Sequence, residues 1–196
     1  MLICKQQLIS VTDPTRLGTQ LRHFNTLKWH TSALLFDVEK AFDSVWHNGL
    51  LYKLLNYNIP KYLLRLISSF LTDRTISVKV SDTTSDPVHL EAGTPQGSVL
   101  SPILFILYVN DLPVNPNNNI QVSQYADDLA LWTSAPNPNY ANIRLRRAID
   151  DLELWCSRWR IKLNAGKTQL LHSTSKRITT HLSLYQEPIK PSNPVT

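Results

Sequence analysis

The sequence predicts an α+β fold, and three observations support this fold class. Residues 33–36 (ALLF) form a short continuous apolar run, typical of a buried strand, that ends at Asp37. Two later runs, 120–125 and 129–132, indicate a pair of strands joined by a tight turn. Several other segments carry apolar residues three and four positions apart, as on one face of a helix. The expected order is β-α-α-β-β-α-β-β-α-β, which favours an antiparallel sheet with helices packed on one face.

The first half of the chain contains two predicted helices and a hairpin. Segments 47–58 and 61–71 show the helical spacing, and Ile59-Pro60 separates them because proline cannot continue a helix. Residues 76–80 (ISVKV) alternate apolar and polar side chains, and residues 88–92 can pair with them across the polar turn SDTTSD. These segments are therefore expected to form two helices followed by a short hairpin.

The second half contains two further predicted helices. The GTPQG loop at 93–97 precedes 98–112, a segment so poor in charge that we expect a helix buried on most sides. Residues 140–160 are predicted to form an amphipathic helix whose apolar stripe consists of Leu145, Ile149, Leu152, Trp155 and Trp159. We interpret both tryptophans as core packing and not as platforms for stacked bases. The segment LNAGKTQLL then supplies the last strand of the expected order.

The composition is that of a globular protein. Of 196 residues, 42% are hydrophobic and 18% are charged, and this length allows one compact domain with a small appended lobe. Cys4 and Cys156 lack the spacing of a zinc site, so we expect reduced thiols without a disulfide partner. No apolar run approaches the roughly 20 residues of a membrane span, and the N-terminus is too polar for a signal peptide. We therefore expect a soluble intracellular protein without a membrane partner, and the sequence does not distinguish nucleus from cytoplasm.

The positive charge is concentrated towards the end of the chain. Residues 1–140 carry 10 Lys and Arg against 11 Asp and Glu, whereas residues 141–196 carry 10 against 4, which gives −1 and +6. The basic last third fits a partner with a phosphate backbone. It fits a solvated helix face equally well, so charge alone leaves both interpretations open.

Two adjacent aspartates stand in an apolar setting in YADDLALW, at 125–132. Asp127 and Asp128 fall at the tip of the predicted hairpin, where a tight turn lets consecutive side chains act together. Asp37 ends the buried strand, and neighbouring strand ends would bring it alongside. Three carboxylates at one sheet edge cannot all stay ionised without a cation, and an oxygen-rich group without His or Cys suits Mg²⁺. Taken singly, each aspartate also fits a solvated turn or a cap.

Four segments together resemble a known family. FDVEKAFDSVW (36–46), AGTPQGSVLSPILF (92–105), YADD (125–128) and a run with W-x-x-x-W and LN-x-x-KT (155–168) are similar to four successive palm motifs of reverse transcriptases. The likeness is strongest to non-LTR (LINE-type) retrotransposons, in particular the jockey-like group, and it covers residues 31–172. Four motifs in the order of the family are a specific signal.

The resemblance implies a polymerase palm that acts as an RNA-directed DNA polymerase. Asp37, Asp127 and Asp128 would form the catalytic triad that binds two Mg²⁺ ions, with Mn²⁺ as a substitute. The implied partners are an RNA template, a DNA primer and dNTPs. The implied reaction is nucleotidyl transfer to the primer 3′-hydroxyl, with pyrophosphate as the leaving group.

The resemblance also implies roles for Phe42, Gln96 and Lys167. Phe42 matches an aromatic ring beneath the incoming sugar that excludes a 2′-hydroxyl, and its alternative is a core phenylalanine. Gln96 matches the residue that touches the nascent base pair, and its alternative is an ordinary turn. Lys167 matches a catalytic lysine able to protonate the leaving pyrophosphate, and its alternative is a surface lysine. Arg74 and Lys79 are expected either to meet nucleic-acid phosphates or to be solvated.

Both ends depart from the pattern of the family. Residues 1–30 lack the fingers motifs and are expected to form an irregular lead-in. Residues 173–196 are expected to form a polar, frayed C-terminal tail, where the family continues into a primer grip and a thumb. We therefore expect residues 31–172 to form a palm that is truncated at both ends, with incomplete fingers and no thumb. As an isolated chain it is expected to be weakly active or inactive.

Three other functions stay open from the residues alone. In the first, the chain is a degenerate relic that acts only as an RNA-binding module through the basic residues 141–196. In the second, it is a scaffold without nucleic acid, in which the aspartates merely cap turns. In the third, it is an RNA-dependent RNA polymerase. This class shares the two-metal palm, but it does not need an aromatic ring such as Phe42 to exclude a 2′-hydroxyl.

Overall fold

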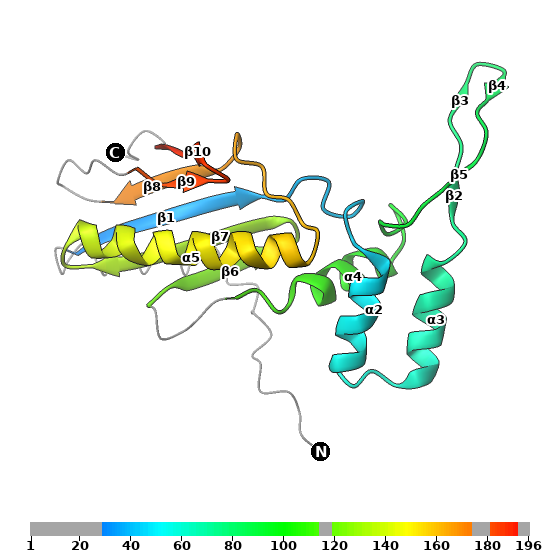
Figure 1. The fold of residues 1–196 in the computed structure, drawn as a ribbon, viewed down its shortest axis with the longest axis horizontal. Helices are drawn as coiled ribbons and strands as arrows, with labels where there is room; N and C mark the ends of the chain where they lie inside the picture. Colours follow the sequence, from blue (N-terminus) through cyan, green and yellow to red (C-terminus); the bar gives the residue numbers. More distant parts are fainter. Residues whose placement is uncertain (1–28, 114–118, 174–180, 192–196) are drawn as a thin grey trace. The chain divides into compact units, whose positions relative to one another are not determined.

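The chain folds into two compact units. The computed structural model describes residues 29–113, 119–173 and 181–191 (Figure 1). One unit, here called the sheet unit, comprises Met1–Glu39 and Asp111–Thr196, and the other, the helical unit, comprises Lys40–Asn110. The lead-in expected over 1–30 lies almost entirely outside the described residues. The domain boundaries expected from the sequence stay predictions.

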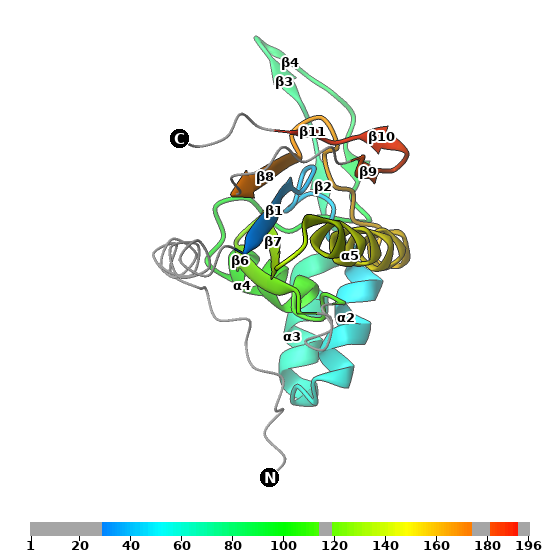
Figure 2. The same ribbon diagram turned by 90° about the vertical axis from the view of Figure 1, so that its left-hand side faces the viewer.

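The sheet unit is built on a five-stranded sheet in the order β11-β8-β1-β7-β6 (Figures 1 and 2). Its strands are β1 (His30–Asp37), β6 (Gln121–Tyr125), β7 (Asp128–Ala135), β8 (Gln169–Ser173) and β11 (Lys190–Pro191). β1 lies at the centre and pairs antiparallel with β7 and β8, while β11 pairs parallel with β8. The predicted antiparallel sheet is therefore confirmed at its centre and is mixed at one edge.

Buried side chains determine the register of β1 and β7. Leu34 pairs with Leu131 and Phe36 pairs with Leu129, and each of these four side chains is at most 5% exposed. Directly opposed side chains of an antiparallel pair lie on the same face of the sheet, so these four form one β1–β7 apolar row. A slip by one residue would turn this row towards the other face, which makes the register costly to change.

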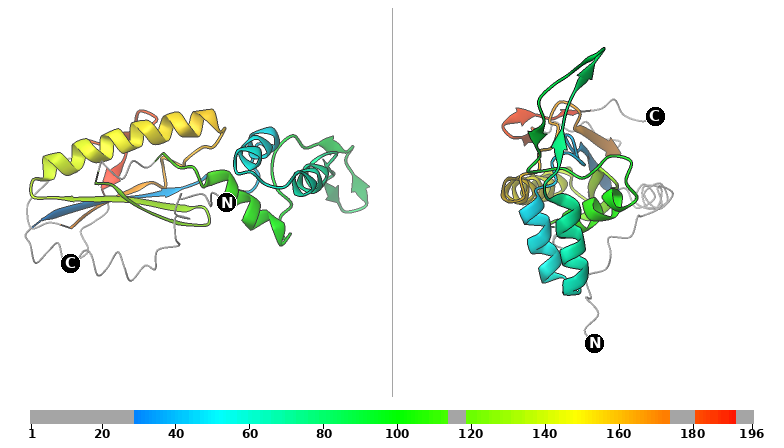
Figure 3. Two further views of the ribbon diagram at one scale, coloured as in Figure 1. Left: turned by 90° about the horizontal axis from the view of Figure 1, so that it is seen from below. Right: turned by 90° about the vertical axis from the view of Figure 1, so that its right-hand side faces the viewer.

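The helix α5 (Pro138–Arg158) lies along one face of this sheet and contacts β7 and β1 (Figures 2 and 3). At its start, the Asn137 side chain accepts a hydrogen bond from the Asn139 N–H at 2.9 Å, which caps the helix. Its buried residues are Ala141, Leu145, Ile149, Leu152, Trp155 and Cys156. The predicted amphipathic helix is confirmed, except that Trp159 is its half-buried C-cap and not part of the buried stripe.

Cys156 is buried on α5. Burial raises the pKa of its thiol to about 12, and a hydrogen bond with Tyr185 offsets only part of this rise. The thiol therefore stays protonated at neutral pH, and a protonated buried thiol is unreactive. Cys4 lies outside the described residues.

Residues 181–191 form short strands, so the expectation of a frayed tail is wrong for them. β9 (Ser183–Leu184) and β10 (Glu187–Pro188) pair antiparallel, and β11 adds to the edge of the main sheet. The apolar side chains of this polar segment are each at most 5% exposed: Leu182, Leu184 and Ile189. Their burial holds the segment, although they are too few to give a clear periodic signal in the sequence.

The helical unit contains α2 (His47–Asn56), α3 (Lys61–Leu71) and α4 (Leu100–Val109). α2 contacts both α3 and α4 (Figure 3). Pro60 is the N-cap of α3, which agrees with the predicted break between the first two helices. All three predicted helices are confirmed, and α2 and α4 are somewhat shorter than expected.

The helix α4 is less buried than its lack of charge suggests. Its buried residues are Ser101, Leu104, Phe105, Tyr108 and Val109, which share one side. On the other side Ile103 and Ile106 are 51% and 45% exposed, so the expected burial on most sides is wrong. Neither α4 nor any other helix in the described part of the chain is long and apolar enough to cross a membrane.

A two-stranded ribbon connects α3 to the GTPQG loop (Figure 1). Near its base β2 (Thr75–Ile76) pairs with β5 (Val88–His89), and near its tip β3 (Lys79–Val80) pairs with β4 (Thr83–Thr84). Both pairs are antiparallel, which confirms that a hairpin forms here. Its pairing differs from the prediction, because β4 lies within the expected turn and only residues 88–89 of the expected strand 88–92 belong to β5. Lys79 is exposed on this ribbon.

Two leucines of α5 test the core of the sheet unit. Leu145 is 0% exposed and Leu154 is 68% exposed. A leucine-to-alanine substitution at the two positions therefore changes helix propensity equally, but removes a buried side chain only at position 145. Leu145→Ala should lower the free energy of unfolding by about 2–5 kcal/mol, because it removes packed methyl groups and leaves a cavity. Leu154→Ala should change it by about 0.5 kcal/mol or less. Urea unfolding followed by circular dichroism measures both, and equal losses would contradict the packing described.

Candidate active site

Two aspartates face each other at the end of the central strand pair. Asp37 is the last residue of β1, Asp128 is the first residue of β7, and the antiparallel register pairs them directly. Side chains of such a pair lie on the same face, with Cβ atoms about 4.5–5.5 Å apart. Like charges in this arrangement repel each other, so a nearby cation stabilises the pair.

Asp127 lies in the turn that joins β6 to β7. Tyr125 pairs with Asp128, which leaves Ala126 and Asp127 as a two-residue turn. Ala126 has a positive φ of 51°, as the first central residue of a tight hairpin turn requires. The predicted hairpin tip is confirmed, although alanine gives no sequence signal for a left-handed backbone.

Lys167 places a positive charge beside Asp37. Its Nζ lies 3.2 Å from Asp37 Oδ2 and 3.4 Å from Asp37 Oδ1. The two side chains are 66% and 30% exposed, so water screens this ion pair and it contributes about 1 kcal/mol or less. The ammonium group therefore offsets part of the repulsion between Asp37 and Asp128.

Asn164 connects the turn of Lys167 to β1. The Asn164 N–H donates to the Asp37 carbonyl at 2.8 Å. The Lys167 N–H donates to the Asn164 carbonyl and to Asn164 Oδ1, each at 3.2 Å. The Thr168 hydroxyl donates to the same carbonyl at 2.8 Å. Asn164 was not among the predicted site residues, although an asparagine three positions before the lysine is typical of turns closed by side-chain hydrogen bonds.

The carboxylates do not form a group of three metal ligands. Within the described ranges, no set of three or more His, Cys, Asp or Glu side chains is placed to hold a metal ion. The sequence predicts that Asp37, Asp127 and Asp128 converge. The structure pairs two of them directly, Asp37 and Asp128. Two carboxylates still fit Mg²⁺, which binds through one or two of them and takes its other ligands from water and substrate phosphates.

In the helical unit, the GTPQG loop is hydrogen-bonded to the segment that carries Phe42. The Thr94 N–H donates to the Phe42 carbonyl at 2.8 Å. Gln96 is exposed, and its Nε2 donates to Asp43 Oδ1 at 3.1 Å. The half-buried Phe42 ring packs against Phe105 of α4 with ring centroids 5.3 Å apart. The two residues predicted to contact the nucleotide, Phe42 and Gln96, are therefore held by one local network.

Gly93 allows the loop to come close to Asp43. It has a positive φ of 90°, and a Cβ at this position would lie 3.1 Å from the Asp43 Cα and from its carbonyl oxygen. Gly97 also has a positive φ, of 82°, but nothing lies within 4 Å of its Cβ position. At position 97 only the positive φ favours glycine. At position 93 glycine is favoured both by the positive φ and by the short distance to the Asp43 backbone.

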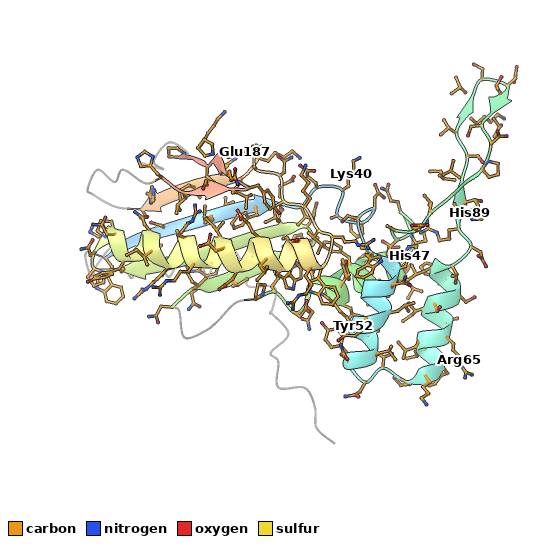
Figure 4. All side chains as sticks on the ribbon, in the orientation of Figure 1. Lys40, His47, Tyr52, Arg65, His89 and Glu187 are labelled. Atoms are coloured by element: carbon orange, nitrogen blue, oxygen red, sulfur yellow. The ribbon has the colours of Figure 1, made fainter. Side chains whose placement is uncertain are left out.

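Two side chains donate to the carbonyl of Gly93. His47 Nε2 lies 2.7 Å from this oxygen, and Arg74 Nη1 lies 2.9 Å from it (Figure 4 labels His47). Arg74 was expected to meet phosphates or to be solvated, but it is half-buried and bonded to the backbone. His47 was not predicted to have a role. A hydrogen bond between residues 46 positions apart leaves no local signal in the sequence.

The described fold is shared with solved telomerases. An apo telomerase of Candida tropicalis, truncated from its C-terminal domain, matches with a TM-score of 0.61 at 18% identity, over 86% of this chain and 37% of that one. A Candida albicans telomerase in complex with a TWJ fragment of telomeric RNA matches with a TM-score of 0.59 at 15% identity, over 90% of this chain and 32% of that one. At these identities the likeness concerns the fold alone, and it confirms the predicted class of an α+β polymerase palm.

The family follows from the sequence. Residues 4–190 match the family model described as Reverse transcriptase (RNA-dependent DNA polymerase). The chain belongs to the reverse transcriptase family.

Its relatives include polymerases of Drosophila mobile elements. The chain is 36% identical over 147 residues to the RNA-directed DNA polymerase from mobile element jockey of Drosophila funebris, which covers 71% of this chain and 16% of that protein. It is 37% identical over 148 residues to the probable RNA-directed DNA polymerase from transposon BS of Drosophila melanogaster, over 72% of this chain and 16% of that protein. The chain thus spans about a sixth of the length of these relatives. The predicted resemblance to jockey-like reverse transcriptases is confirmed.

The two glycines of the loop allow a matched test. Gly97→Ala should lower the free energy of unfolding by about 1–2 kcal/mol, because alanine is strained at a positive φ. Gly93→Ala should lower it by about 1–3 kcal/mol more, since the new Cβ is forced against the Asp43 backbone. Differential scanning calorimetry compares the two variants. If the Gly93→Ala and Gly97→Ala variants are equally stable, the close contact between residue 93 and the Asp43 backbone is contradicted.

Proposed function

We propose that this chain is the palm of an RNA-directed DNA polymerase, which transfers nucleotides from dNTPs to the 3′-hydroxyl of a DNA primer paired with an RNA template. The observation that carries the proposal is the direct pairing of Asp37 with Asp128 at the end of β1 and β7. Membership of the reverse transcriptase family supports it, as do relatives named RNA-directed DNA polymerases.

Asp37 and Asp128, with Asp127 in the adjoining turn, are proposed to hold two Mg²⁺ ions, which Mn²⁺ can replace. The donor atoms are carboxylate oxygens, the hard ligands that Mg²⁺ prefers. When bound, the ions supply activation of the primer hydroxyl and neutralise charge on the triphosphate during in-line displacement. The repulsion between Asp37 and Asp128 favours the binding of such cations.

Lys167 is proposed to protonate the leaving pyrophosphate as a general acid. Its turn is tied through Asn164 to the end of β1, so its ammonium group stays within reach of Asp37. For the proposed role the ammonium group has to leave the Asp37 carboxylate for a phosphate oxygen. This exchange costs little, because a partly exposed ion pair is weak.

Phe42 is proposed to select deoxyribonucleotides, and Gln96 to touch the nascent base pair. A flat ring beneath the sugar leaves no room for a 2′-hydroxyl. Phe105 holds the Phe42 ring, and Asp43 accepts a hydrogen bond from the Gln96 amide. Each side chain is thus supported before any nucleotide binds, which lowers the entropic cost of positioning it.

An RNA template and a DNA primer are the proposed partners. Residues 141–196 carry a net charge of +6, which suits contact with phosphates. A solved telomerase that shares the fold is described in complex with a fragment of telomeric RNA. Binding through phosphates weakens steeply with salt, and this dependence separates it from binding by other means.

Primer extension on poly(rA)/oligo(dT) with Mg²⁺ tests the polymerase function. We expect weak dTTP incorporation with short products from this chain. Asp127→Asn should abolish metal-dependent incorporation and leave salt-sensitive RNA binding unchanged, because the substitution alters the carboxylates and not the basic residues. Incorporation that survives Asp127→Asn would contradict the proposed role of the carboxylates.

The same assay separates the alternatives. RNA binding without any incorporation would favour an RNA-binding module, and absent or salt-insensitive RNA binding would favour a scaffold. Incorporation of UTP in preference to dTTP would favour an RNA-dependent RNA polymerase and contradict the role of Phe42.

Lys167→Gln tests the competition between the ammonium group and a metal ion for Asp37. It should tighten Mn²⁺ binding by up to about fivefold, because it removes an ion pair of about 1 kcal/mol or less. The control is Lys162→Gln, whose ammonium group lies 3.2 Å from Glu39 and is exposed to a similar degree. Free Mn²⁺ measured by electron paramagnetic resonance gives both affinities. Equal affinities in the two variants would show that Lys167 does not compete.

A further inference from the structure

The carbonyl of Gly93 is held by donors from two different elements. His47 is the first residue of α2, and Arg74 lies between α3 and β2. Their nitrogens lie 2.7 Å and 2.9 Å from the Gly93 oxygen. A carbonyl oxygen has two lone pairs, so both are used here. Since a carbonyl only accepts hydrogen bonds, His47 carries a proton on Nε2.

Gly93 has little freedom to move. It is buried, and its N–H donates to the Val45 carbonyl at 2.9 Å. A Cβ on Gly93 would also lie 3.1 Å from the Asp43 Cα and from its carbonyl oxygen, so a larger residue would have to displace the Asp43 backbone by a few tenths of an ångström. The N–H of Gly93 is thus fixed by a backbone hydrogen bond, and its carbonyl is fixed by two side chains. A shift of the loop would break at least one of these bonds.

The loop passes this constraint to the residues proposed to contact the nucleotide. The Thr94 N–H and hydroxyl donate to the Phe42 carbonyl at 2.8 Å and 3.4 Å. Gln96 follows two residues later and donates to Asp43 Oδ1 at 3.1 Å. Because Thr94 is adjacent to Gly93, any displacement of the Gly93 peptide displaces the Phe42 backbone contact and the start of the Gln96 turn.

We propose that His47 and Arg74 are positioning residues for nucleotide selection, and this inference rests on the proposed polymerase function. One donor is enough to satisfy a buried carbonyl. A second donor, from another element, restricts the direction in which the carbonyl can move. The pair therefore clamps the GTPQG loop and sets Phe42 and Gln96 relative to each other within the helical unit. Neither His47 nor Arg74 touches the substrate in this proposal.

His47→Ala and Arg74→Ala test the clamp one donor at a time. Each variant leaves the other donor on the carbonyl, so the unit keeps its fold while the loop gains freedom. The matched controls are His89→Ala and Arg65→Ala, which remove exposed side chains of the same types from the same unit (Figure 4). His47→Gln and Arg74→Lys retain a donor and should restore part of the effect.

Hydrogen–deuterium exchange of the segment 92–97, measured by mass spectrometry, reports on the clamp without any need for activity. Both alanine variants should exchange at least about threefold faster than the wild-type chain, because the loop opens more often. The two controls should exchange at the wild-type rate. Exchange in His47→Ala and Arg74→Ala that equals the controls would overturn the clamp.

Single-nucleotide incorporation measures how strongly the chain selects dTTP over UTP. Both alanine variants should raise the KM for dTTP by about three- to tenfold with kcat within about twofold, and should lower the preference for dTTP over UTP. A residue with only a structural role would lower the amount of active protein and leave KM and this preference unchanged. Faster exchange with unchanged KM and preference would therefore overturn the link to selection. If the wild-type chain incorporates too little dTTP to measure, equilibrium binding of dTTP and UTP gives the same preference, and a preference unchanged in both alanine variants would overturn the link to selection. The exchange measurement decides separately whether the clamp exists.

Discussion

The direct pairing of Asp37 with Asp128 is the constraint on which the proposed chemistry depends. Two carboxylates repel by about 1 kcal/mol at 4 Å in water, and Asp128 is exposed to it. The β1–β7 apolar row opposes this repulsion, because a change of register would expose buried side chains worth about 1.5–3 kcal/mol each. Apolar burial on one face of the sheet therefore holds like charges together on the other face.

The two units position their functional side chains by different means. In the sheet unit the backbone ladder places Asp37 opposite Asp128, and this placement does not depend on the side chains themselves. In the helical unit side-chain hydrogen bonds hold the loop that carries Gln96, from His47 and Arg74 on one side and from Asp43 on the other. Substitutions away from the site should therefore disturb Phe42 and Gln96, the residues proposed to contact the nucleotide, more readily than the carboxylates.

The parts of the fold that the sequence could predict are those with local causes. Helices were predicted from apolar residues three and four positions apart, and the hairpins from alternating apolar and polar residues. The pairing of Asp37 with Asp128 agrees with the expected meeting of neighbouring strand ends, whereas the roles of these aspartates stay predictions. The partners of Gly93 could not be predicted, because Arg74 and His47 are close to it only in space. The strands within 181–191 were missed for a related reason, since three buried apolar side chains in a polar segment have no visible period. The exposed side of α4 was missed because composition reports apolar residues and not which of them find a partner.

The weakness of the Lys167–Asp37 ion pair is itself informative. A strong, buried pair would neutralise Asp37 permanently and would compete with any cation brought by a nucleotide. Because both side chains are partly exposed, the pair offsets repulsion while the site is at rest and can be broken at little cost. Asn164 keeps the Lys167 backbone in place through this exchange, so the ammonium group stays within reach of Asp37 and of a phosphate bound beside it. The same lysine can therefore lower the cost of holding two carboxylates together and still be free to take the proposed role of proton donor.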